Sequence, residues 1–201
     1  MKQKGLEILL QKVPQPTNPT PTLEQYMTPA SIAADIIFNA YQFGDIDDKI
    51  IVDLGCGTGI FSIGVAILGA KKIIGFDVDK ESIQLAKKHA EQNTLEIDFM
   101  VTDVDSVQTK CDTVLMNPPF GAQKSNQKAD RKFIEKGFEI GGIIYSLHLT
   151  KTIPFLEKMI SSLNGTITHQ KKYLFPIKWQ FEFHKKDVIK YNVSLIRIKT
   201  A

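Results

Sequence analysis

The segment Asn117-Pro118-Pro119-Phe120 combines residue types that can hold a flat aromatic amine for chemistry. The lone pair of such an amine is delocalised into the ring, which makes the nitrogen a poor nucleophile. The Asn117 side-chain carbonyl and the Pro118 backbone carbonyl can each accept one N–H, and the two prolines fix the backbone between them. The motif therefore predicts methyl transfer to an aromatic amine by positioning and electrostatic complementarity, with Phe120 stacked on the base. A rigid turn without chemistry is the alternative interpretation.

A glycine-rich segment from Asp53 to Gly59 indicates where the methyl donor binds. Its glycines at 55, 57 and 59 permit a tight turn and let a ligand approach bare backbone. Dinucleotide-binding loops need a small residue at the sixth position of their motif, where this chain has Ile60. The spacing therefore favours S-adenosylmethionine over NAD and disfavours a dehydrogenase. A glycine-rich turn that binds no ligand is the alternative.

Three acidic residues follow expected strand ends and complete the candidate cofactor site. Asp53 suits the cationic amino-acid end of the cofactor, and Asp77 can accept both hydroxyls of a ribose. Asp103 can accept the exocyclic amine of the cofactor's adenine, or it can simply cap its own loop. The candidate cofactor residues in this part of the chain are Asp53, Gly55, Gly57, Asp77, Val78, Asp103, Val104 and Asn117.

The elements that position these residues alternate between strand and helix from residue 50 onward. Strands are expected at 50–54, 72–77, 97–102, 113–116, 143–147, 166–175 and 188–198, and helices at 60–68, 80–93, 132–140 and 153–163. This order predicts an α/β fold with a parallel sheet covered by helices on both faces. The last two strands lack a helix between them, so we expect them to pair antiparallel.

The N-terminal part of the chain is expected to differ from the rest. A short helix at 6–13 precedes four prolines, at 14, 16, 19 and 21. Thr28 has the type of an N-cap and Pro29 that of a first helical residue, and Gly44 would end the helix that follows. We assign residues 1–29 to an N-terminal extension and 30–201 to the catalytic domain. A simple linker is the alternative for the proline-rich stretch.

Composition excludes several classes of protein. Two cysteines without a CxxC and four scattered histidines predict neither a disulfide framework nor a metal site. No apolar run approaches the length of a membrane span, so we expect a cytoplasmic protein without a membrane contact. The net charge of +3 permits an anionic partner without requiring one.

Basic residues gather in two regions where RNA could bind. The first holds Lys124, Lys128, Arg131 and Lys132; the second holds Lys171, Lys172, Lys178, Lys185 and Lys186, interleaved with Phe175, Trp179, Phe181 and Phe183. Basic residues mixed with aromatics suit single-stranded or looped RNA. The candidate RNA-binding residues are Lys124, Arg131, Lys185 and Lys186. The alternative is a solvated face with the aromatics in the core. His148 is expected to be a satisfied strand-end histidine.

On these motifs the chain resembles the methyltransferase-like protein 5 family of ribosomal RNA adenine methyltransferases and its archaeal relatives. The similarity runs through 23–26, 53–59, 75–77, 117–121, 145–148 and 183–186, and the last three segments are the specific ones. It implies a Rossmann-like, seven-stranded class I S-adenosylmethionine-dependent methyltransferase with a mostly parallel sheet and an antiparallel last strand. It also implies N6-methylation of adenine in small-subunit ribosomal RNA.

The resemblance adds a lid and a partner. It implies that Gln25, Tyr26 and Thr28 close over the cofactor, although Met27 stands where the family often has proline. It further implies a small zinc-binding adaptor of the Trm112 type, bound by strand addition at 96–101.

Two other functions compete with RNA methylation. A protein glutamine methyltransferase faces a similar positioning problem, but its families usually carry tyrosine where this chain has Phe120. A non-catalytic cofactor-binding scaffold predicts decay of the cofactor or catalytic loop, and both are intact here.

Overall fold

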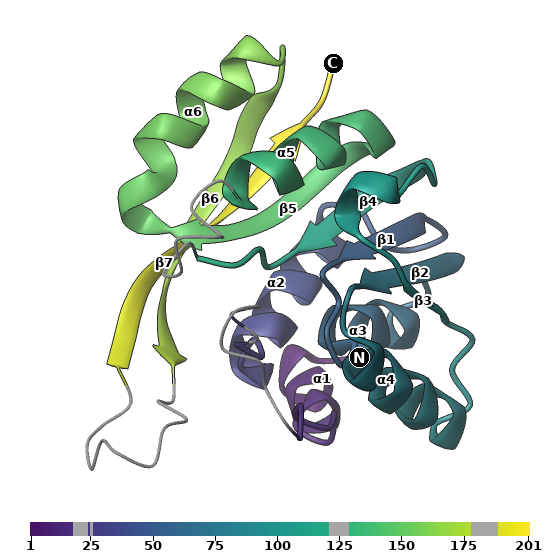
Figure 1. Cartoon of the computed structure of the whole chain (residues 1–201). Coiled ribbons are helices and arrows are strands. Elements are labelled where there is room, and N and C mark those ends of the chain that lie inside the picture. The colour runs from purple at the N-terminus through teal and green to yellow at the C-terminus, as the bar shows by residue number, and fades with distance from the viewer. Residues whose placement is uncertain (18–23, 25, 121–128, 178–188) are drawn as a thin grey trace.

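The computed structural model describes residues 1–17, 24, 26–120, 129–177 and 189–201. Its sheet has the strand order β3-β2-β1-β4-β5-β7-β6 (Figure 1). The strands are β1 Ile50–Leu54, β2 Lys72–Asp77, β3 Asp98–Val101, β4 Cys111–Met116, β5 Gly141–Leu149, β6 Thr166–Ile177 and β7 Ile189–Lys199. The first five are parallel, and β7 is antiparallel to both of its neighbours, β5 and β6. The predicted mostly parallel α/β sheet and its antiparallel closing pair are confirmed.

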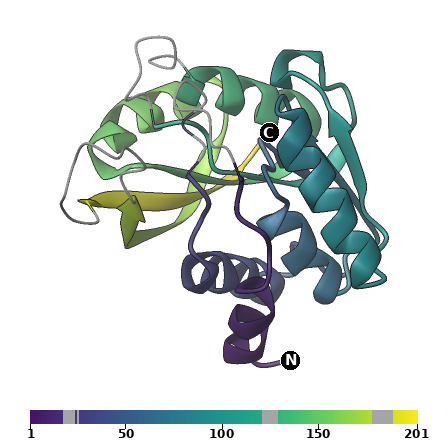
Figure 2. The same ribbon diagram turned by 60° about the horizontal axis from the view of Figure 1, so that its bottom comes forward.

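Helices cover both faces of the sheet, as expected (Figures 1 and 2). One face carries α1 Gln3–Leu10, α2 Ala30–Gln42, α3 Ile60–Ile67 and α4 Lys80–Gln92; the other carries α5 Ala129–Ile140 and α6 Ile153–Ser162. Short 3-10 helices lie at Val104–Ser106 (η2) and Thr150–Thr152 (η4). Within the described ranges, no helix is long and apolar enough to cross a membrane.

Strand residues alternate between two apolar layers. Ile51, Ile73 and Leu115 pack with α1, α2 and α3, whereas Val52 and Ile74 pack with the layer of α5 and α6. Burial on both faces explains why these short strands are nearly continuous apolar runs. The polar residues that follow them therefore gather at the carboxyl ends of the strands.

The N-terminal helix is part of the core. Leu6, Leu10 and Val13 are buried between α1 and the neighbouring helices. One local prediction here was wrong: α2 begins at Ala30 with Pro29 in the N-cap position, and no side chain caps it. Thr28 lies one residue too early to reach the free N–H groups of the first turn, and its hydroxyl has a different partner.

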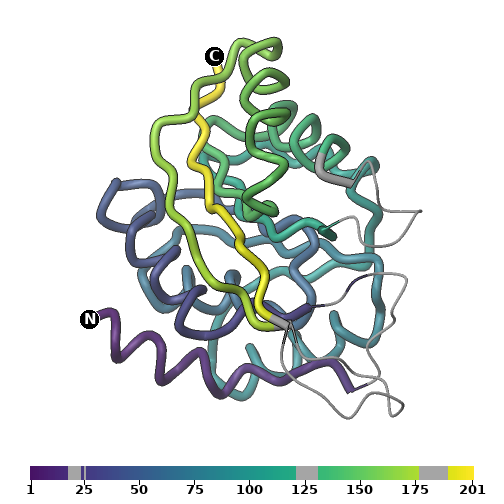
Figure 3. The backbone as a smooth tube through the Cα atoms, turned by 90° about the vertical axis from the view of Figure 1, so that its left-hand side faces the viewer, coloured from purple at the N-terminus to yellow at the C-terminus, as the bar shows by residue number. Residues whose placement is uncertain are grey.

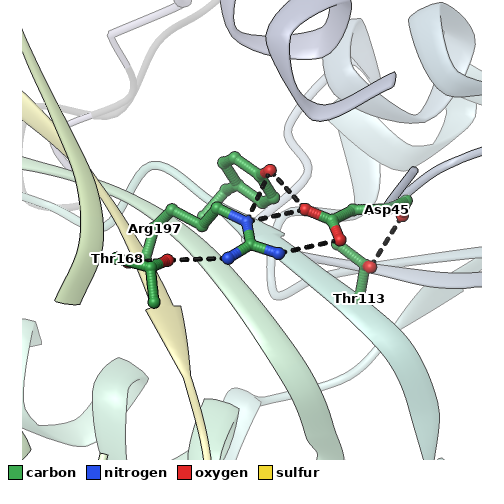
Figure 4. A network of polar contacts seen from close by, with 5 residues as sticks. Asp45, Thr113, Thr168 and Arg197 are labelled. Carbon is green, nitrogen blue, oxygen red and sulfur yellow. Dashed lines mark hydrogen bonds and ion pairs between the residues drawn. The ribbon is translucent and has the colours of Figure 1, made fainter. Parts of the chain in front are cut away.

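A buried polar network fastens β6 and β7 to the loop before β1 (Figure 4). Arg197 donates from Nε and Nη2 to the two carboxylate oxygens of Asp45, at 2.7 and 3.0 Å. The hydroxyl of Tyr145 also donates to Asp45, and Arg197 donates from Nη1 to Thr168. Thr113 donates to the Asp45 backbone carbonyl. Since bidentate arginine–carboxylate pairs are geometrically specific, this network holds β6 and β7 in a fixed position against the parallel strands.

The β6–β7 pair forms a long ribbon (Figure 3). Leu149, the last residue of β5, pairs with Val193, while residues 190–192 pair with 174–176 farther along. The ribbon therefore extends beyond the carboxyl end of β5, on the side of the sheet where residues 117–120, the predicted catalytic loop, lie.

Candidate active site

A cavity of about 400 Å³ opens at the carboxyl ends of the parallel strands. This is where open α/β sheets bind their ligands. Its wall includes residues from the segment before α2, the glycine loop, the ends of β2 and β3, the catalytic loop and α5: Tyr26, Thr28, Gly55, Gly57, Asp77, Val78, Asp103, Val104, Asn117, Pro119 and Phe133. Most of the sequence-predicted cofactor residues are thus brought together in one place.

The glycine loop has the backbone that its sequence predicts. Gly59 precedes α3 with φ of +87°, a conformation that L-residues with a side chain rarely adopt. A Cβ at Gly59 would also lie 2.8 Å from the Phe99 ring. The third glycine therefore serves close packing of the loop against β3, and Gly57, with φ of +53° and no atom near a built Cβ, leaves open space beside the cavity.

Asp53 does not line the cavity but is buried between β1 and α3, with 1% of its surface exposed. Its Oδ2 accepts from the Ser62 backbone N–H and hydroxyl, at 3.0 and 2.7 Å. Its Oδ1 is buried and has no hydrogen-bond partner among the described residues. Burial raises the pKa of Asp53 to about 7 despite the Ser62 bonds. A cationic group beside Oδ1 would satisfy this oxygen and restore the ionised form.

Asp77 joins the end of β2 to the glycine loop. Its Oδ2 accepts from the Gly57 backbone N–H at 2.7 Å, and its Oδ1 accepts from the Asp79 N–H at 2.9 Å. Burial raises the pKa of the Asp77 carboxyl. Each carboxylate oxygen can accept more than one hydrogen bond, so Asp77 still has capacity for two ligand hydroxyls.

Asp103 lies where either of its two predicted roles, binding the cofactor's adenine or capping its own loop, is possible. It lines the cavity, and its Oδ1 accepts from the Asp105 N–H and so caps η2. The same oxygen accepts from Lys132 Nζ at 2.9 Å, and this contact holds the pKa of Asp103 below its usual value. Lys132 thus belongs to the cavity wall, where it also pairs with Asp105.

The catalytic loop places one end of the Asn117 amide against the N-terminal segment. Asn117 Nδ2 donates to the Thr28 hydroxyl at 3.1 Å and to the Tyr26 carbonyl at 3.5 Å. Because that carbonyl can only accept, it must face the nitrogen end of the amide. Asn117 Oδ1 is left buried without a hydrogen-bond partner among the described residues. The amide therefore has one unused acceptor, as the predicted chemistry requires.

The other residues of the loop have different surroundings. Pro118 is buried, and Pro119 lines the cavity. The Phe120 ring is not on the cavity wall; it packs edge-on against Phe175 of β6, with ring centroids 5.5 Å apart. Its stacking on a substrate base stays a prediction, and the contact ties the catalytic loop to the β6–β7 ribbon.

Comparisons with known proteins identify the family of this chain. Residues 34–144 match the family described as the methyltransferase small domain. The rRNA N(6)-adenosine-methyltransferase METTL5 of Danio rerio is 35% identical over 98% of both chains. The chain belongs to the METTL5 family of methyltransferases.

Further relatives of this METTL5-family chain are similar in length. An uncharacterised protein of Methanocaldococcus jannaschii is 40% identical, over 99% of this chain and 94% of its own. The crystal structure of a Pyrococcus horikoshii protein, described as a candidate RNA methyltransferase, matches with a TM-score of 0.92 at 35% identity, over 100% of this chain and 98% of that one. A candidate protein N5-glutamine methyltransferase of M. jannaschii is 30% identical over 73% of this chain and 77% of its own.

Sequence reasoning missed some of the site of this METTL5-family chain. Glu24 is buried on the cavity wall, and Phe133 lies against Gly55, 3.2 Å from where a Cβ would be. No local spacing identifies Phe133, because α5 brings it to the loop from a distant part of the chain. Glu24 lies within a segment that carried the family resemblance, and this was the available signal.

The predicted RNA-binding residues are only partly described. Lys124, Lys185 and Lys186 lie outside the described residues, as does Gln25 of the predicted lid. Arg131 is exposed and pairs with Glu135 at 2.9 Å. Such a surface pair is weak and leaves Arg131 able to bind a phosphate instead, so its role stays a prediction. His148 is buried within bonding distance of Ser146 Oγ, as expected for a satisfied histidine.

Proposed function

We propose that this METTL5-family chain transfers the methyl group of S-adenosylmethionine to the N6 amine of an adenine in RNA, most specifically in small-subunit ribosomal RNA. The observation that carries the proposal is the buried, unpartnered Oδ1 of Asn117 at the cavity. Adenine presents an exocyclic amine whose N–H needs such an acceptor. The activity named for the Danio rerio relative, rRNA N(6)-adenosine methylation, supports the same substrate.

The residues around the cavity fit the proposed cofactor. Asp53 lies off the cavity wall, but its buried Oδ1 has no partner among the described residues, and this would suit the ammonium of the cofactor's amino-acid end. Asp77 would accept the ribose hydroxyls, and Asp103, with Val78 and Val104 beside it on the wall, would receive the adenine. When bound, S-adenosylmethionine supplies a methyl group made electrophilic by the adjacent positive sulfur.

The protein's part in the reaction is to orient the amine. Asn117 Oδ1 and the Pro118 carbonyl would each accept one N–H, which turns the nitrogen lone pair toward the methyl carbon. The nitrogen would gain the methyl group as that group's bond to sulfur breaks, with the electron pair staying on sulfur, and the nitrogen would then release one proton to water. No general base is required, because the amine becomes acidic only after the new bond has formed.

The N-terminal extension, residues 1–29, would serve as the cofactor lid. Pro16, Glu24, Tyr26, Met27 and Thr28 line the cavity, and α1 holds the extension to the core. These contacts favour a functional segment over a simple linker. The hydrogen bond from Asn117 to Thr28 would then make the catalytic amide dependent on the lid.

A Trm112-type adaptor would bind the β3 edge of the sheet. Met100 and Val101 are each 51% exposed on this edge strand, which is unusual for side chains of their size. An exposed edge offers unpaired backbone groups for a further strand. The proposed contact falls on 96–101.

The experiment that tests the proposed substrate class uses labelled S-adenosylmethionine, total ribosomal RNA and ribosomal proteins, with and without a Trm112-type adaptor. We expect label in the RNA fraction. Label confined to protein would instead support the glutamine methyltransferase, for which the 30% identical M. jannaschii protein is the specific observation. Cofactor binding with no label in either fraction would support a non-catalytic scaffold.

A further inference from the structure

The two faces of the β6–β7 ribbon differ in what their side chains contact. Side chains on one face, including Lys171, Tyr173 and Phe175, point toward α2 and the apolar layer around it. Lys171 Nζ lies 2.6 Å from Asp35 Oδ2, which also accepts from the Tyr173 hydroxyl at 2.6 Å. The positive charge of Lys171 is therefore paired with a carboxylate of the same chain.

The opposite face of this part of the ribbon carries two exposed lysines. The alternation of a strand puts Lys172, Leu174 and Pro176 on this face, and the register pairs them with Ser194, Asn192 and Lys190. Lys172, Leu174, Lys190 and Asn192 are all exposed, and the Leu174 side chain is 62% exposed. Ser194 Oγ lies 3.0 Å from Thr150 Oγ1, which brings η4 and the exposed Lys151 beside the same face.

The charge of this face is not balanced within the part of the chain that the structure describes. Lys151 of η4, Lys172 of β6 and Lys190 of β7 form no ion pair there. By contrast, Lys171 of β6 and Arg197 of β7 are each paired with an aspartate. β6 and β7 contain no aspartate or glutamate. Three unpaired lysines around an exposed leucine and asparagine form a surface suited to a polyanion.

The position of this face connects it to the site. The ribbon extends past the carboxyl end of β5, toward the end of the sheet that carries the loop of residues 117–120, and that loop contacts the ribbon from its other face, where Phe120 packs against Phe175. A chain bound along the outer face would therefore lie at the same end of the sheet as the loop that holds Asn117.

We propose that Lys151, Lys172 and Lys190, with Leu174 and Asn192 between them, form a docking surface for the backbone of substrate RNA. The inference rests on the proposed function and adds the surface that holds the nucleic acid while one adenine enters the site. The lysines contact phosphates and give affinity without sequence preference, whereas Asn117 selects the amine. Exposed apolar Leu174 gives an unstacked base or a ribose a surface to cover.

The test compares two double variants with the same change of charge. K172E/K190E reverses two lysines of the surface; K71E/K72E reverses two exposed lysines at the amino end of β2, at the opposite end of the strands from the cavity. Binding of a labelled single-stranded oligoadenylate is measured by fluorescence anisotropy over a series of salt concentrations. For K172E/K190E we expect binding weaker by about tenfold or more, and a log–log salt slope smaller by about 1.4, the value for two phosphate contacts on a single strand.

The control variant and a measurement of cofactor affinity separate a loss at the proposed surface from a general effect of charge or misfolding. K71E/K72E should bind the oligonucleotide nearly as wild type, and both variants should keep wild-type cofactor affinity. Equal losses in the two variants would attribute the effect to net charge and overturn the proposal. Unchanged RNA binding in K172E/K190E, with lost binding to polyglutamate, would assign the surface to an acidic protein and also overturn it.

Failure of the proposed function can be distinguished from failure of the docking surface. If wild-type protein labels no RNA, the substrate class is wrong. If it labels RNA and K172E/K190E does so with an unchanged KM, the substrate class stands and the docking surface is wrong.

Discussion

Asn117 donates a hydrogen bond from Nδ2 to the hydroxyl of Thr28, 3.1 Å away and 89 residues earlier in the chain. This bond and the weaker one to the Tyr26 carbonyl leave Oδ1 as the unused end of the amide. The catalytic loop and the segment before α2 are therefore parts of one site. Thr28 is a positioning residue in this account, because it acts through Asn117.

Replacing Asn117 by alanine should abolish turnover and leave cofactor binding almost intact. Removal of one positioned polar group from an active site typically lowers kcat by about 100- to 1,000-fold. Calorimetric titration of the cofactor and single-turnover methylation of RNA measure the two effects separately. A large loss of cofactor affinity would show that Asn117 mainly holds the cofactor.

Thr28→Val should lower kcat by roughly 2- to 10-fold, because it removes one ordinary hydrogen bond at nearly constant side-chain volume. Thr28→Ser keeps the hydroxyl and should restore most of the rate. The KM for RNA should change little in either variant. Equal rates for valine and serine at position 28 would show that the Asn117 bond does not matter for catalysis.

Asp77→Ala should weaken cofactor binding by about 10- to 100-fold, since hydrogen bonds to charged groups contribute about 1.5–3 kcal/mol. Asp77 also accepts from the Gly57 N–H, so a thermal unfolding scan must accompany the titration. Asp77→Asn, which keeps one acceptor for that N–H, separates the two roles. Wild-type affinity in a folded Asp77→Ala protein would remove Asp77 from the cofactor site.

Cofactor binding should tighten as pH rises through about 7, the value to which burial raises the pKa of Asp53. Only the ionised carboxylate attracts an ammonium, and the ionised fraction grows as pH increases through the pKa. Titrations between about pH 5.5 and 7.5 measure this slope while the cofactor amine is still largely charged. Asp53→Asn should bind more weakly and lose the slope; a slope that persists in that variant would come from another group.

Arg197→Met should destabilise the fold without touching the cofactor site. It leaves the Asp45 carboxylate buried without its bidentate partner, and breaking such a pair costs about 3–5 kcal/mol. Lys199→Met, at the exposed end of the same strand, is the matched control. Chemical denaturation measures both; equal stability of the two variants would mean that the network contributes little.

The sequence predicted all the strands and α-helices described from residue 50 onward, because each has a local apolar pattern of the right period, but it did not predict the short 3-10 helices η2 and η4. Their bounds differ by a few residues, as with α5, which begins at Ala129 instead of 132. The candidate cofactor residues also came from local signals: glycines in a turn and acids at strand ends. Local patterns sufficed because successive parallel strands bring their carboxyl ends to one edge.

Contacts between segments distant in the sequence could not be predicted from such local patterns. Thr28 matched the N-cap pattern, but its partner is Asn117 on another element. Asp45 and Arg197 are 152 residues apart, and neither lies in a recognisable motif. Lys171 and Lys172 are neighbours in a basic cluster, yet strand alternation puts the first against Asp35 and the second in solvent. Such relationships depend on tertiary packing, which periodicity does not encode.

Nucleoside analysis of ribosomal RNA methylated in vitro by the wild-type protein and by Asn117→Ala tests directly whether Asn117 orients an adenine amine. We expect N6-methyladenosine as the labelled nucleoside with wild type and almost none with the variant. Label in any other nucleoside, or N6-methyladenosine formed equally well by Asn117→Ala, would contradict the role of the Asn117 acceptor in orienting an adenine amine.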